Sequence, residues 1–99
     1  MTPAAFRRSL SQETPPVGLS PALTALWWLG KDNWDKAHGL VANEGSADCA
    51  WVHAHLHRVE GDLDNARYWY RRARHEPARG ELGDEWAAIA AVLLKPKHP

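Results

Sequence analysis

The chain has 99 residues, enough for one small domain, and its 12 Lys and Arg residues balance its 12 Asp and Glu residues. The zero formal net charge argues against bulk attraction to nucleic acid or to a membrane surface, so we expect neither as a partner. Cys49 is the only cysteine, which excludes an intrachain disulfide and favours a reducing compartment. We find no secretory signal and no apolar run near the roughly 18 residues of a membrane span, so we predict a cytoplasmic protein.

The first part of the chain lacks the periodicity of regular secondary structure. Residues 1–19 contain three prolines and scattered Ser and Thr residues, without an apolar repeat of period 2 or 3.6. We predict an extended or disordered N-terminal arm over this range, from which Phe6 and Leu10 could dock on the folded part. The helical domain is predicted to span residues 20–95.

Capping residues and helix breakers divide the remainder of the chain into five predicted helices. Ser20, followed by a proline at the first helical position, begins the first helix, and Gly30 is expected to end it as a left-handed C-cap. The second helix begins near Asp32 or Asn33 and stops at 43–45. The other boundaries are Ser46 or Asp48 to Glu60 for the third helix, Asp62 to Pro77 for the fourth, and Asp84 to a stop before Pro96 for the fifth. No segment alternates like a strand, so the predicted fold class is all-α.

Two parts of this helical pattern repeat at an offset of 29 residues, which places Trp34 on Leu63 and Ala37 on Ala66. Small residues recur where two helices approach closely, as in helical-hairpin repeats. The segment 61–73 has a Gly between paired helices, then an Ala, an aromatic pair and a small residue, namely Gly61, Ala66, Trp69, Tyr70 and Ala73.

This segment resembles tetratricopeptide repeats, and more closely their Sel1-like relatives. The resemblance implies two helical hairpins plus a C-terminal capping helix. It also implies a non-enzymatic module that binds another protein or peptide, and no catalytic residues are carried over from it. No catalytic signature occurs in the sequence itself, so we predict that the protein is not an enzyme.

The third predicted helix carries an unusual set of histidines. At 3.6 residues per turn, Cys49, His53, His57 and Glu60 fall on one side of this helix. Two imidazoles one turn apart can bind zinc or another divalent transition metal, with Cys49 or Glu60 as a third ligand. The alternative is a buried histidine pair satisfied by hydrogen bonds. The residue after His53 is Ala54, so the base glutamate of zinc metalloproteases is missing.

Charge is distributed unevenly along the chain. Residues 67–79 hold five arginines against one glutamate, whereas residues 30–66 carry seven acidic and three basic side chains. Arg67 and Arg71 share a helical face that is either simply solvated or able to bind phosphate or stack on RNA bases. The opposite charges of the two segments also favour association of one copy of the chain with another, as a homodimer.

The leading functional hypothesis is therefore a protein- or peptide-interaction module of tetratricopeptide or Sel1-like type. Its predicted binding surface consists of Trp51, His55, Arg58, Arg67 and Arg71. The alternative is a small metal- or ligand-binding protein that uses His53 and His57, with Cys49 as a further candidate ligand. If Cys49 is not a ligand, we expect it to be a buried, inert thiol.

Overall fold

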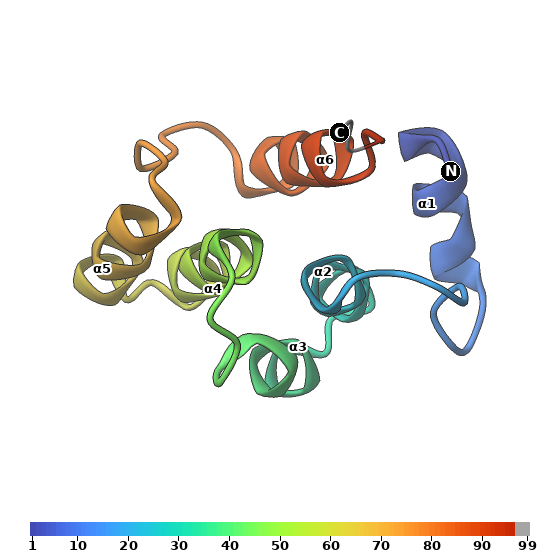
Figure 1. Cartoon of the computed structure of the whole chain (residues 1–99), viewed down its shortest axis with the longest axis horizontal. Helices are drawn as coiled ribbons and strands as arrows, with labels where there is room; N and C mark the ends of the chain where they lie inside the picture. The colour runs from blue at the N-terminus through green and yellow to red at the C-terminus, as the bar shows by residue number, and fades with distance from the viewer. Residues whose placement is uncertain (97–99) are drawn as a thin grey trace.

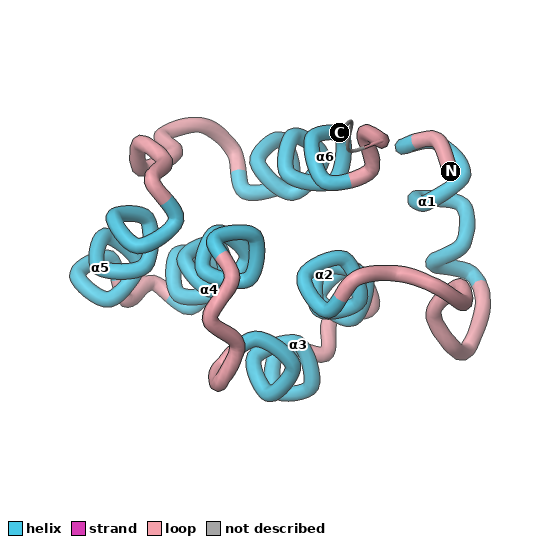
Figure 2. Tube along the Cα trace, in the orientation of Figure 1, coloured by secondary structure: helices cyan, strands magenta, loops and turns pink. Residues whose placement is uncertain are grey.

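A computed structural model describes residues 1–96, and these residues form α-helices, one 3-10 helix and loops, with no strand (Figures 1 and 2). The all-α class is thereby confirmed. The elements in chain order are α1 Pro3–Arg8, the 3-10 helix η1 Ser9–Ser11, α2 Pro21–Gly30, α3 Trp34–Val41, α4 Ala47–Glu60, α5 Leu63–Ala73 and α6 Leu82–Leu93.

Helix α4 lies at the centre of the molecule. Figure 1 shows α5 on one side of it and α2 and α3 on the other, with α6 crossing above, and α4 contacts all four helices. Every residue from 49 to 57 is buried. A helix buried on all sides must satisfy each of its polar side chains inside the protein, and α4 carries three histidines in this stretch.

Most predicted helix boundaries are confirmed by side-chain capping. Ser20, Ser46 and Asp62 each accept a hydrogen bond from the backbone N–H three residues further on, and each precedes a helix. Gly61 ends α4 in the left-handed conformation, with φ at 87°, where a Cβ atom would be strained.

Three boundaries differ from the sequence prediction. Helix α5 ends at Ala73, with Arg74 as its left-handed C-cap, rather than at Pro77. Gly30 lies inside α2, and the C-cap is Lys31. A Cβ atom at position 30 would come within 2.9 Å of the end of the Leu10 side chain and 3.0 Å of Trp86, so this glycine allows close packing rather than a left-handed turn. Helix α6 begins at Leu82 after Glu81, whose side chain does not cap it, and not at Asp84.

The prediction of an extended or disordered arm over residues 1–19 is wrong for residues 3–11, which form α1 and η1. Thr2 caps α1 and Pro3 takes its first position, which gives a short helix with too few turns to show a period in the sequence. Phe6 is fully buried and stacks on Trp86, with ring centroids 5.5 Å apart. Trp27 Nε1 donates a hydrogen bond to Ser9 Oγ at 3.0 Å, so this segment is part of the core.

None of the helices in the described part of the chain has the length and apolar character needed to cross a membrane.

Candidate metal centre

Three histidines from two helices converge between α3 and α4. His38 lies on α3, and His53 and His57 lie one turn apart on α4. Each offers one ring nitrogen to a group in which all three nitrogens lie within 4.8 Å of one another. The sequence had predicted the α4 pair, and the structure adds His38.

His53 is the most deeply buried member of this cluster, which we call the His38 cluster (His38, His53 and His57). It is only 3% exposed, and Trp69 from α5 stacks on its ring at a centroid distance of 3.8 Å. Burial, reinforced by the neighbouring His57 and His38, lowers the pKa of His53 to about 4. The imidazole is therefore neutral at pH 7, the form that binds metal ions.

One ring nitrogen of His53 lacks a hydrogen-bond partner among the described residues. Nδ1 of His53 is buried and has no hydrogen-bond partner among the described residues. A buried polar atom without a partner costs about 1–3 kcal/mol of stability, so such atoms are rare in native proteins. Among the buried side-chain nitrogen and oxygen atoms of residues 1–96, Nδ1 of His53 is the one without a hydrogen-bond partner.

His57 is held in place by a carboxylate. Its Nδ1–H donates a hydrogen bond to Glu60 Oε1 at 2.5 Å, which leaves Nε2 as the ring nitrogen free to bind a metal. Metal-bound histidines usually donate their second N–H to a carboxylate in this way, and the contact orients the ring and increases its basicity. Glu60 thus orients a ligand, and it also lies near Asp62 in a second, exposed group of potential ligands around His57.

His38 is positioned by Trp34. The two rings are one helical turn apart and stack at a centroid distance of 4.8 Å, with an interplanar angle of 8°. Trp34 Nε1 donates a hydrogen bond to the carbonyl oxygen of Leu56 at 2.7 Å, which ties α3 to α4 beside the cluster. The sequence pattern did not single out His38, which lies one helical turn after Trp34 on α3.

The cluster has the donor atoms of a three-histidine metal site. Tetrahedral Zn²⁺ binds imidazole nitrogens at about 2.0–2.1 Å, which places two such nitrogens about 3.3 Å apart. The three nitrogens lie within 4.8 Å of one another, so a bound ion would have to draw them closer. Three protein ligands leave a fourth coordination position for water or another small molecule.

Cys49 does not belong to this site. It is absent from both groups of potential ligand atoms found within residues 1–96, and it is 2% exposed. Burial raises the pKa of its thiol, which favours the protonated, unreactive form. The structure therefore does not place Cys49 among the grouped ligand atoms, and the expectation of a buried thiol is confirmed.

Most of the predicted protein-binding surface is not at the surface. His55 is 1% exposed, and Trp51 is 9% exposed with the ring of His75 stacked on it at 3.8 Å. Arg58 is held by Glu85 and by the carbonyl oxygen of Gly80. Arg67 and Arg71, by contrast, lie exposed on α5.

His55 belongs to a different cluster, the Glu85 network (His55, Arg58, Tyr70 and Glu85). Glu85 Oε1 accepts hydrogen bonds from His55 Nδ1 at 2.6 Å and from Arg58 Nη1 at 3.0 Å, and Oε2 accepts one from the Tyr70 hydroxyl. Burial alone would raise the pKa of Glu85, but these donors outweigh it and lower the pKa. Burial and the hydrogen bond to Glu85 raise the pKa of Tyr70, so the phenol stays protonated.

Comparison of this chain with protein-family models, with curated proteins and with solved structures found no match.

Proposed function

We propose that the protein binds a divalent transition metal ion through His38, His53 and His57. The observation that carries this proposal is the orphaned Nδ1 of His53 inside a cluster of three convergent imidazoles. A histidine pair retained only for packing would be expected to find hydrogen-bond partners, as His55 does.

The donor set indicates which metals the site prefers. Three neutral imidazoles suit Zn²⁺, Cu²⁺ and Ni²⁺, whereas Mg²⁺ and Ca²⁺ prefer oxygen ligands. Trp34 and Trp69 cover two of the rings and limit the access of water. The aromatic cover and the burial of His53 and His57 favour retention of a bound ion over rapid exchange with solvent.

The proposal is tested by isothermal titration of the metal-free protein with Zn²⁺. We expect one high-affinity equivalent for the native chain, and a loss of affinity of at least about 100-fold for His38→Ala, because two imidazoles remain where three are needed. His75→Ala is the matched control, since His75 is exposed and lies outside the cluster. Equal affinity of the native chain and His38→Ala would reject the proposal.

A second candidate function is the interaction module that the resemblance to tetratricopeptide repeats implies. The outer face of α5 supports it, because Leu63 is 54% exposed and Tyr68 is 44% exposed on the same helix as Arg67 and Arg71. The five arginines of residues 67–79 favour an acidic peptide as the partner. The segment 61–73 would then belong to a Sel1-like hairpin formed by α4 and α5.

Binding to an array of acidic peptides tests this candidate. The native chain should bind a subset of them, and the double change Arg67→Glu with Arg71→Glu should abolish that binding without altering helicity, because both side chains are exposed. Binding that survives this charge reversal would exclude the α5 face as the interaction surface.

A further inference from the structure

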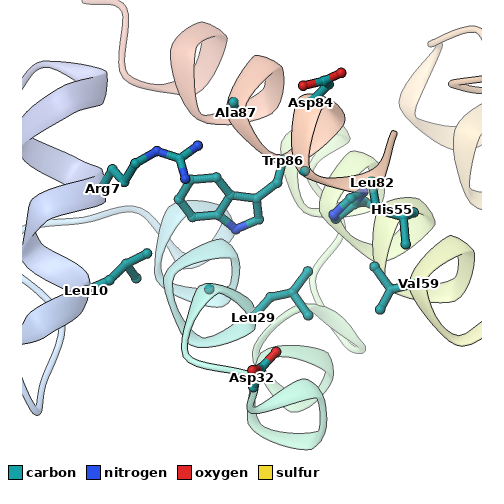
Figure 3. A pocket seen from close by; sticks show the side chains of 12 residues that line it. Arg7, Leu10, Leu29, Asp32, His55, Val59, Leu82, Asp84, Trp86 and Ala87 are labelled. Atoms are coloured by element: carbon teal, nitrogen blue, oxygen red, sulfur yellow. The ribbon is translucent and has the colours of Figure 1, made fainter. Parts of the chain in front are cut away.

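A cavity separate from the His38 cluster opens between α1, α2, α4 and α6 (Figure 3). Its volume is about 570 Å³, within the range of about 300–1,000 Å³ that is usual for small-molecule sites. The apolar part of its lining consists of the side chains of Leu10, Leu29, Val59, Leu82 and Trp86. We call it the α1–α6 cavity.

Two features make its shape fixed. Trp86 Nε1 donates a hydrogen bond to the carbonyl oxygen of Leu26 at 2.9 Å, and Phe6 stacks on the indole ring, so the ring cannot turn freely. Gly30 also lines the cavity, and a Cβ atom there would come within 2.9 Å of the end of the Leu10 side chain and within 3.0 Å of Trp86. A cavity with rigid aromatic and aliphatic walls is suited to a flat apolar body.

His55 supplies a polar group to this apolar cavity. Figure 3 shows its ring at one side, close to Val59 and Leu82. Because Glu85 accepts the hydrogen bond of Nδ1, the polar atom that His55 can offer to a ligand is Nε2. A hydroxyl group is both a donor and an acceptor, so it can pair with Nε2 whether or not that nitrogen carries a proton.

The charges around the cavity disfavour an anionic ligand. Asp32 and Asp84 contribute two negative charges to its lining, against one positive charge from Arg7. The Arg7 guanidinium already lies over the Trp86 ring, 5.0 Å from its centroid. A carboxylate ligand would therefore meet a net negative rim, and an uncharged ligand would not.

We infer that the α1–α6 cavity binds a small, uncharged aromatic alcohol, with its ring against Trp86 and Leu29 and its hydroxyl group hydrogen-bonded to Nε2 of His55. This site is independent of the proposed metal site, because the cavity and the His38 cluster share no residue. The ring supplies most of the binding free energy through buried apolar area, and the hydroxyl group selects among ligands of similar shape.

Three probes of similar shape test the inference by NMR: p-cresol, toluene, which lacks the hydroxyl group, and 4-hydroxybenzoate, which is an anion. Saturable shifts of the Trp86 indole N–H signal are expected with p-cresol. Toluene should bind roughly tenfold more weakly, because it leaves Nε2 of His55 unpaired, and 4-hydroxybenzoate more weakly than p-cresol. No saturable shift with p-cresol up to about 10 mM, or equal affinity for p-cresol and toluene, would overturn the inference.

Variants locate the site. Ala87 lines the cavity, so Ala87→Trp should fill it and abolish p-cresol binding, whereas Ala88→Trp, one position along α6 and outside the cavity, should not. His55→Phe should reduce the affinity for p-cresol to that for toluene. The Ala87→Trp result stands even if His55→Phe fails to fold, because Ala87 is not part of the Glu85 network. Binding that survives Ala87→Trp would place the ligand elsewhere and refute the inference.

Discussion

Helix α4 contributes histidines to two clusters, which differ in whether their buried polar atoms have hydrogen-bond partners. In the Glu85 network, His55 and its neighbours Arg58 and Tyr70 all donate to one carboxylate. In the His38 cluster, three imidazoles face one another with no carboxylate between them, and one buried nitrogen stays without a partner. Both clusters are buried against the same helix, so burial alone does not distinguish them.

The presence or absence of hydrogen-bond partners distinguishes histidine nitrogens that stabilise the fold from nitrogens that are available to a ligand. A buried polar group that is fully satisfied contributes to the stability of the fold, and its removal leaves its partners uncompensated. A buried group with an orphaned atom lowers stability unless something binds to it. We therefore assign the hydrogen bonds to Glu85 to the stability of the fold, and we propose the His38 cluster as the metal site. Nε2 of His55 takes no part in the hydrogen bond to Glu85, which uses Nδ1.

The largest expected effect comes from breaking the Glu85 network. The change Glu85→Ala leaves His55, Arg58 and Tyr70 without their shared acceptor. We expect it to lower the free energy of unfolding by about 3–5 kcal/mol, the usual result of removing one partner from a buried charged pair. Urea denaturation followed by circular dichroism measures it, and a loss below about 1 kcal/mol would contradict a structural role for the network.

The pH dependence of stability should separate the two clusters. His53 has its pKa lowered from 6.5 to about 4, so the unfolded chain binds a proton more readily than the folded one between these values. Stability is then fully present above pH 6.5 and falls, by on the order of 3 kcal/mol, as the pH drops to about 4. Glu85 has its pKa lowered from 4.5, so its contribution is lost only below that pH.

Urea denaturation of the metal-free protein across this pH range measures both effects. The change His53→Leu should remove the loss between pH 6.5 and 4 and leave the loss at lower pH. If the native chain and His53→Leu follow the same curve, His53 does not titrate as proposed.

A smaller effect is expected at neutral pH in the absence of metal. The change His53→Leu replaces an orphaned polar group by an apolar one of similar volume, next to Trp69. We expect the free energy of unfolding to stay within about 1 kcal/mol of the native value or to rise, whereas Zn²⁺ binding is lost. Destabilisation by more than about 2 kcal/mol would mean that His53 makes stabilising contacts of its own and would weaken the contrast with Glu85.

Sequence patterns predicted the elements that depend on local chemistry. The capping side chains of Ser20, Ser46 and Asp62 set helix starts, and Gly61 sets a helix end, because each acts within one turn of the chain. The helix α1 was not predicted, because it is too short to show a period in the sequence. The possible docking of Phe6 was recognised, and its stacking on Trp86 confirms it.

In the candidate site, too, the sequence predicted what depends on local spacing and not what depends on helix packing. The pair His53 and His57 was found from helical spacing alone. His38 was not, because its approach depends on how α3 packs on α4. The burial of His55 was also missed, since its partner Glu85 lies 30 residues away and only the packing of α6 brings it there.

The most direct test of the metal-site assignment is an NMR titration of the metal-free protein with Zn²⁺ that follows the imidazole ring nitrogens. We expect the signals of His38, His53 and His57 to shift together, with the shifts complete at one equivalent of Zn²⁺. The signal of His55 should stay in place, because its Nδ1 is bonded to Glu85. Unchanged signals of the His38 cluster, or shifts confined to the exposed His75, would contradict the division of α4 into a structural and a metal-binding cluster.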